Sequence, residues 1–167
     1  MNLYIVRHAI AVERGTPGYE DDNQRPLTDS GRKKMKKIVK GIHQLGFELD
    51  VILSSPYVRA RDTATILAGE FKMKDRVEFS DNLIPSGDFD SLVNEIHEKY
   101  DLDNVALVGH EPMLSSLISW LTTGNADMKI TLKKGGVGCL LADNLHLERR
   151  ATLEWLLTPP LMIELSK

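Results

Sequence analysis

Short apolar runs alternate with amphipathic segments over the first three quarters of the chain. The runs at residues 3–6, 51–53 and 104–108 are typical of buried strands, and a weaker run lies near residues 77–79. Between the runs, apolar residues recur at helical spacing. In the segment before Gly46 they form one face: Met35, Ile38, Val39, Ile42 and Leu45. This alternation predicts an α/β fold, a three-layer sandwich in which a mixed, mostly parallel sheet is flanked by helices.

Local signals mark the ends of the helices. Thr28 is placed to cap a helix that Gly46 ends. The Ser-Ser-Pro sequence at residues 54–56 predicts that the next helix starts there, with a serine as cap and Pro56 in its first turn, and runs to about residue 70. A turn at residues 84–88 precedes a helix over residues 89–100. Pro112 opens the helix that follows the strand at residues 104–108.

The last quarter of the chain has a different pattern. Strand-like runs lie near residues 129–132, 138–142 and 152–156, without a helical segment between them. Strands that follow one another this closely are antiparallel in most sheets. We expect the Thr-Pro-Pro sequence at residues 158–160 to end the last element.

Composition narrows the class of protein. A chain of 167 residues favours one domain over residues 1–167, and 42% apolar residues are enough for one core. The net charge of −3 does not suggest nucleic-acid binding. The single cysteine, Cys139, cannot form an internal disulfide or a multi-cysteine metal site. No signal peptide and no membrane-spanning run is visible, so we expect a cytoplasmic protein that does not bind membranes.

Basic side chains follow three of the predicted strands. Arg7 and His8 come directly after the first strand, Arg59 lies in the first turn of the helix after the second, and His110 follows the strand at residues 104–108. If these strands are parallel, all four residues lie at the carboxyl edge of one sheet, where open α/β sheets bind their ligands. The sequence therefore predicts one site that combines two arginines with two histidines.

This set of residues suits a phosphoryl group. The planar guanidinium of arginine matches phosphate oxygens, and the start of a helix adds backbone N–H groups. A neutral histidine with one free ring nitrogen can attack phosphorus, provided that its other nitrogen donates a hydrogen bond. We expect Arg7, Arg59 and a protonated His110 to stabilise the transferred group.

Four segments of the chain resemble the histidine phosphatase superfamily, also called phosphoglycerate mutase-like. The segments are residues 6–9, 25–31, 54–64 and 108–112, and the likeness extends from residue 3 to about residue 155. The short chain and the turn at residues 84–88 look most like the phosphohistidine phosphatase subgroup typified by SixA. The resemblance implies that His8 is the phosphorylated nucleophile and that Arg7, Arg59 and His110 bind the phosphate. It implies no metal and no cofactor.

The sequence departs from the family pattern at two places. Ala9 stands where the family usually has glycine, a change that only a positive φ would make costly. Larger members also carry a glutamate acid after the third strand, and no glutamate lies between residues 81 and 90. Asp88 and Asp81 are the candidate acids, and it is equally open that neither serves. An imidazole leaves phosphorus more readily than an alkoxide, so a phosphohistidine substrate needs less proton donation.

We therefore expect hydrolysis of phosphohistidine on a histidine-phosphorylated phosphotransfer protein. The alternatives are a phosphomonoesterase or mutase that acts on a small metabolite, and a module that binds phosphate or phosphoproteins without turnover. The basic run at residues 32–40 is either a solvated helix face or a docking surface for an acidic phosphoprotein. The loop at residues 13–24 is either a lid or disordered.

For the remaining polar residues the sequence allows only less specific predictions. Thr63, one turn after Arg59, either orients that arginine or packs the helix. We expect structural or exposed positions for the other three histidines, His43, His97 and His146, because no partners for a metal or a catalytic triad lie near them in the sequence.

Overall fold

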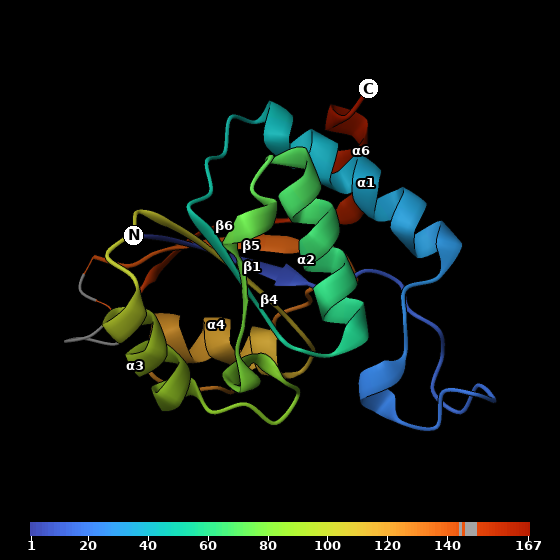
Figure 1. The fold of residues 1–167 in the computed structure, drawn as a ribbon. Coiled ribbons are helices and arrows are strands. Elements are labelled where there is room, and N and C mark those ends of the chain that lie inside the picture. The colour runs from blue at the N-terminus through green and yellow to red at the C-terminus, as the bar shows by residue number, and fades with distance from the viewer. Residues whose placement is uncertain (144, 146–149) are drawn as a thin grey trace.

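A six-stranded mixed sheet forms the middle layer of the molecule in the computed structural model, which describes residues 1–143, 145 and 150–167 (Figure 1). The strand order is β3-β2-β4-β1-β5-β6. The first four strands of that order are parallel, and β5 is antiparallel to both β1 and β6. The strands are β1 (Asn2–Arg7), β2 (Val51–Ser54), β3 (Val77–Phe79), β4 (Asn104–Gly109), β5 (Val137–Leu141) and β6 (Thr152–Leu157).

Helices cover both faces of the sheet (Figure 1). α1 (Asp29–Gln44), α2 (Val58–Glu70) and α6 (Pro159–Leu165) lie on one face, and α3 (Phe89–Lys99) and α4 (Met113–Thr123) lie on the other. Three short 3₁₀ turns, η1 (Asp22–Gln24), η2 (Lys74–Arg76) and η3 (Asp81–Leu83), connect these elements. The predicted three-layer α/β sandwich with a mixed, mostly parallel sheet is confirmed.

Two apolar cores result from this layering. Alternate residues of β1 point to opposite faces, so Leu3 and Ile5 join one core while Tyr4 and Val6 join the other. The apolar face predicted before Gly46 lies in the second core, where Met35 and its neighbours are buried. Burial of both sheet faces accounts for the almost wholly apolar sequences of the central strands.

Three local predictions were wrong. The helix after β2 begins at Val58, with Tyr57 as its N-cap, and not at the Ser-Ser-Pro sequence. The segment at residues 129–132 is not a strand: both edges of β1 are paired, and the Leu132 carbonyl accepts a hydrogen bond from Arg7 instead. The Thr-Pro-Pro sequence opens the short helix α6, because proline fits the first turn of a helix.

Within the described part of the chain, none of the helices combines the length with the apolar composition that a bilayer crossing requires.

Candidate active site

The ends of three adjacent strands bring the predicted residues together. β2, β4 and β1 are neighbours, with Ser54 and Val6 both level with Val108. The ladder continues beyond the strand ends, since the His8 amide donates to the Gly109 carbonyl at 3.0 Å. The chain segments that carry the two histidines therefore leave the sheet side by side. The ring centroids of His8 and His110 lie 5.1 Å apart, at the carboxyl edge of the sheet where the site was expected.

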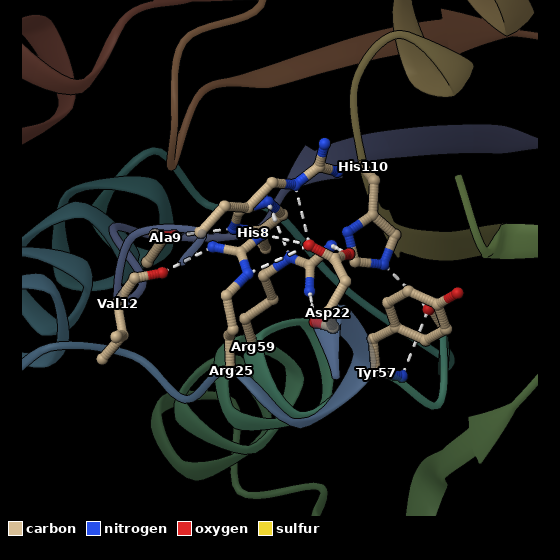
Figure 2. Close-up of polar contacts among 10 residues, drawn as sticks. His8, Ala9, Val12, Asp22, Arg25, Tyr57, Arg59 and His110 are labelled. Atoms are coloured by element: carbon tan, nitrogen blue, oxygen red, sulfur yellow. Dashed lines mark hydrogen bonds and ion pairs between the residues drawn. The ribbon is translucent and has the colours of Figure 1, made fainter. Parts of the chain in front are cut away.

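The ring of His8 is held in one tautomer. Its Nδ1 lies 2.7 Å from the Ala9 carbonyl oxygen (Figure 2). A carbonyl only accepts hydrogen bonds, so Nδ1 carries the proton and Nε2 carries the lone pair. Nε2 accepts a hydrogen bond from Nε of Arg59 at 3.3 Å. The free nitrogen of His8 thus faces a guanidinium, where a phosphoryl group would be bound.

His8 is neutral near physiological pH. Burial is the largest cause that lowers the pKa of His8, and the charges of Arg59 and Arg7 add to it. The hydrogen bond to Ala9 opposes them in part, and together these effects place the pKa at about 3. Only 6% of the residue is exposed. A neutral imidazole is the form that can act as a nucleophile.

His110 lies across from His8 and is 1% exposed. Its Nε2 is 2.9 Å from the hydroxyl of Ser55, and its Nδ1 is buried without a hydrogen-bond partner among the described residues. Burial first, and then the charge of Arg59, lower the pKa of His110 to about 2. His110 is therefore neutral when no anion is bound, and a protonated His110 around a bound phosphoryl group stays a prediction. A bound dianion would raise this pKa, because it favours the charged ring.

A carboxylate that the sequence analysis overlooked is bound to Arg59. Nη2 of Arg59 lies 2.8 Å from Oδ2 of Asp22, and Nη1 donates to the Asp22 backbone carbonyl at 2.5 Å (Figure 2). Arg59 is 2% exposed, so this ion pair is desolvated on the arginine side. Asp22 begins η1, inside the loop at residues 13–24. That loop is thus attached to the site, while its action as a lid stays a prediction.

Two further arginines converge on the same carboxylate. Nη2 of Arg25 and Nε of Arg14 each lie 2.8 Å from Oδ1 of Asp22. Burial raises the pKa of Asp22, but the hydrogen bonds from Arg25 and Arg59 outweigh it and hold the pKa well below its usual range. Asp22 is therefore ionised and unsuited to donate a proton. Asp22 and Arg25 are three residues apart, but Asp22 and Arg59 are separated by 37 residues, so no local pattern in the sequence indicated this cluster.

Arg7 lies at the edge of the site. Its Nη1 donates to the Leu132 carbonyl at 2.7 Å, and its Nε is buried without a hydrogen-bond partner among the described residues. Burial lowers the pKa of Arg7, and the nearby charge of Glu111 partly opposes this. A buried guanidinium N–H that lacks an acceptor is a position where a phosphate oxygen would be stabilised.

Thr63 connects the helix of Arg59 to the loop of His8. Its hydroxyl donates to the Arg59 carbonyl at 2.7 Å and accepts from the Ala9 amide at 3.0 Å. Ala9 has no positive φ, so its methyl group is accommodated where the family usually has glycine.

Both candidate acids are exposed, and Asp88 also has a local structural role. Asp88 is exposed and caps α3, where its carboxylate accepts a hydrogen bond from the Ser91 amide at 2.8 Å. Asp81 is exposed at the start of η3. Nothing in these positions supports a role as proton donor for either residue.

Two of the other three histidines are exposed, His43 at the end of α1 and His97 in α3. His146 lies outside the described residues.

The comparisons with known proteins agree with this geometry. A family model described as histidine phosphatase superfamily (branch 1) matches residues 3–84. An uncharacterised protein of Picosynechococcus is 32% identical over 163 residues, which are 96% of this chain and 97% of the relative. The chain belongs to the histidine phosphatase superfamily.

Within the histidine phosphatases, the similarity extends to SixA. The phosphohistidine phosphatase SixA of Escherichia coli is 25% identical over 149 residues, which cover 83% of this chain and 89% of SixA. A solved structure of the protein histidine phosphatase SixA complexed with tungstate superposes with a TM-score of 0.82, at 21% identity over 96% of this chain and 98% of that one. The SixA-like resemblance stated from the motifs is confirmed.

Proposed function

We propose that this histidine phosphatase hydrolyses phosphohistidine on a phosphotransfer protein, through a phosphoryl group carried on His8. One observation carries the proposal: a buried, neutral imidazole whose Nδ1 is bound to a carbonyl and whose Nε2 faces a buried arginine. An imidazole held in this way has the geometry and the charge state of a nucleophile.

In the first step, Nε2 of His8 attacks the phosphorus of the substrate. The new bond joins Nε2 to phosphorus as the bond from phosphorus to the substrate imidazole breaks, and the electron pair of that bond stays on the substrate nitrogen. His8 becomes a phosphoimidazolium, whose positive charge is stabilised by the Nδ1–H bond to Ala9. Arg59, Arg7 and His110 would bind the equatorial oxygens, where negative charge is spread.

In the second step, water attacks the phosphoryl group on His8. An oxygen–phosphorus bond forms and the bond from phosphorus to Nε2 breaks, so that His8 regains its lone pair. The proton of the water goes to the phosphate or to solvent. The low pKa of His8 helps here, since a weakly basic nitrogen is a better leaving group.

The carboxylates near the site support a nitrogen leaving group over an alkoxide. An alkoxide requires an acid at the leaving side. Asp22 is ionised between arginines, and Asp88 caps α3. Asp81 is exposed at the start of η3. Glu111, whose charge acts on Arg7, accepts a hydrogen bond from the Ser115 amide. A protonated substrate imidazole leaves as a neutral ring and requires no such acid. This chemistry favours phosphohistidine over the ester of a small metabolite.

The test is to trap the intermediate. Wild-type protein is mixed with a phosphohistidine-carrying phosphotransfer domain labelled with ³²P, quenched in alkali and digested. We expect an acid-labile label on the peptide that contains His8, and neither label nor turnover in His8→Ala. His43→Ala is the matched control, because His43 is exposed at the end of α1, and it should keep both.

Two other results would contradict the proposal and indicate a different function. Faster hydrolysis of sugar phosphates or phosphoglycerate than of the phosphorylated domain would assign a phosphomonoesterase or mutase. Tight binding of the phosphorylated domain without labelled His8 or released phosphate would assign a binding module.

A further inference from the structure

A groove with basic walls lies beside the candidate active site, on the side of Arg7. It has a volume of about 640 Å³ and is bounded by the end of β1, the turn before β5, α1 and the start of α6. Its charged lining residues are Arg7, Lys34, Lys133 and Lys134, and no carboxylate is among them. We refer to it as the basic groove. Arg7 lines the groove and also belongs to the candidate active site, so the two lie next to each other.

The lysines of the basic groove are available to a partner. Neither Lys34, Lys133 nor Lys134 takes part in an ion pair among the described residues. Lys133 and Lys134 are exposed, and Lys34 is half-buried. The charge of Lys134 also reaches His8, whose pKa it lowers. Three cations without ion-pair partners among the described residues therefore line a groove next to the candidate active site.

The floor of the basic groove is apolar. Ile10, Pro159 and Pro160 line it between the cations, and the exposed Thr158 adds a hydroxyl. Apart from Arg7, the lining residues offer no buried polar side chain that would fix the orientation of a small molecule. The volume of the groove is also within the range of sites that hold whole ligands and far larger than one phosphoryl group requires.

We propose that the basic groove binds an acidic segment of the phosphorylated protein, next to its phosphohistidine. The proposal rests on the proposed function and names the surface of the substrate that the enzyme recognises. Flexible, hydrated lysines at the rim suit carboxylates on a protein surface, whereas recognition of a second phosphate would favour the planar fork of arginine. The proline and isoleucine floor would contact apolar side chains between those carboxylates.

The experiment compares two synthetic phosphohistidine peptides that differ only in flanking residues, glutamate in one and glutamine in the other. We expect wild-type protein to favour the acidic peptide about tenfold in kcat/KM at low salt, and to lose the preference as salt is added. The variant Lys34→Glu/Lys133→Glu should lose the preference at low salt. Lys134 is left unchanged because its charge acts on His8.

The control is Lys36→Glu/Lys40→Glu, which changes the net charge equally. Both residues are exposed on α1, and Lys36 lies about 200° around the helix from Lys34. This variant should keep the tenfold preference. Phosphoramidate, which is too small to reach the groove lysines, should be hydrolysed at the same rate by wild type and both variants.

The outcomes separate this proposal from the proposed function. Equal rates on the two peptides in wild type would overturn the docking proposal and leave the function intact. Slower phosphoramidate hydrolysis in Lys34→Glu/Lys133→Glu would also overturn it, because the lysines would then serve the phosphoryl group itself. If neither peptide is hydrolysed, labelling of His8 by the phosphotransfer domain decides the function, and NMR shifts decide the groove. The unphosphorylated acidic peptide should shift the amides of Ile10 and Lys133, and no shift would reject docking.

Discussion

At the scale of single residues, two buried histidines define the site. His8 and His110 are both neutral because burial penalises the charged ring and Arg59 adds its own positive charge. The two rings differ in their hydrogen-bond partners: Nδ1 of His8 donates to a carbonyl, and Nε2 of His110 lies next to the hydroxyl of Ser55. Because both rings are neutral in the folded protein, the free energy of unfolding depends on pH.

The first prediction concerns that pH dependence. In the unfolded chain each ring takes up a proton as the pH falls below its ordinary pKa of 6.5, while the folded rings stay neutral down to about pH 3. The unfolded state then binds more protons, so the free energy of unfolding falls as the pH decreases from 6.5 toward 3. Each ring contributes up to about 1.4 kcal/mol per pH unit.

Urea unfolding of wild type and His110→Gln between pH 6.5 and pH 4 measures this. The variant should show a slope smaller by about one proton. His43→Gln, which changes an exposed ring, should keep the wild-type slope. An unchanged slope in His110→Gln would contradict a neutral His110.

The second prediction concerns Asp22. A bound dianion would share Arg59 with this carboxylate and be repelled by it. Asp22→Asn keeps the shape of the side chain and removes the charge, so vanadate should inhibit the variant at roughly three- to tenfold lower concentration. Asp62→Asn, at an ion pair with Arg32 on the surface of α2, is the control and should leave inhibition unchanged. Weaker inhibition of Asp22→Asn would mean that Asp22 chiefly positions the arginines.

At the scale of elements, α1 follows its sequence pattern closely and α2 does not. Thr28 caps α1 as predicted, accepting a hydrogen bond from the Gly31 amide at 3.0 Å. The Ser-Ser-Pro sequence before α2 carries the same local signal. There, however, the Ser55 hydroxyl accepts from the Tyr57 amide at 3.3 Å and pairs with His110. The hydroxyl is thus shared between the turn before α2 and a residue distant in sequence, and the helix begins at Val58 without a side-chain cap.

The third prediction concerns the first turn of α1. A Cβ at Gly31 would lie 2.1 Å from the carbonyl oxygen of Ile10, which cannot move without shifting the loop after His8. Gly31→Ala should therefore lower the free energy of unfolding by about 2 kcal/mol or more. Gly69→Ala is the matched control in α2, since nothing lies within 4 Å of its Cβ, and it should raise stability by roughly 0.5–1 kcal/mol. Thermal unfolding of both variants measures the difference, and equal stabilities would refute the close approach.

At the scale of the whole molecule, the sheet and the positions of four site residues could be predicted from sequence. Apolar strands buried on both faces leave a strong pattern, and parallel strands place their carboxyl ends at one edge. The cluster around Asp22 could not be predicted in this way. It joins a loop to α2 across 37 residues, and no periodic pattern records such a contact. The same holds for the basic groove, whose walls come from both ends of the chain.

The distribution of charge also appears only at this scale. The chain has a net charge of −3, yet the site and its groove gather arginines and lysines. Within this part of the surface, Asp22 neutralises part of that charge. Anions are therefore attracted by the local positive charge at the site, even though the net charge of the whole chain is negative.

The most direct test of the account is a crystal structure of the protein with vanadate. We predict that vanadium lies in line with Nε2 of His8, with its oxygens bound by Arg7, Arg59 and His110. Vanadate bound elsewhere, with Nε2 of His8 still paired to Arg59, would contradict the claim that these four residues form one phosphoryl-transfer site.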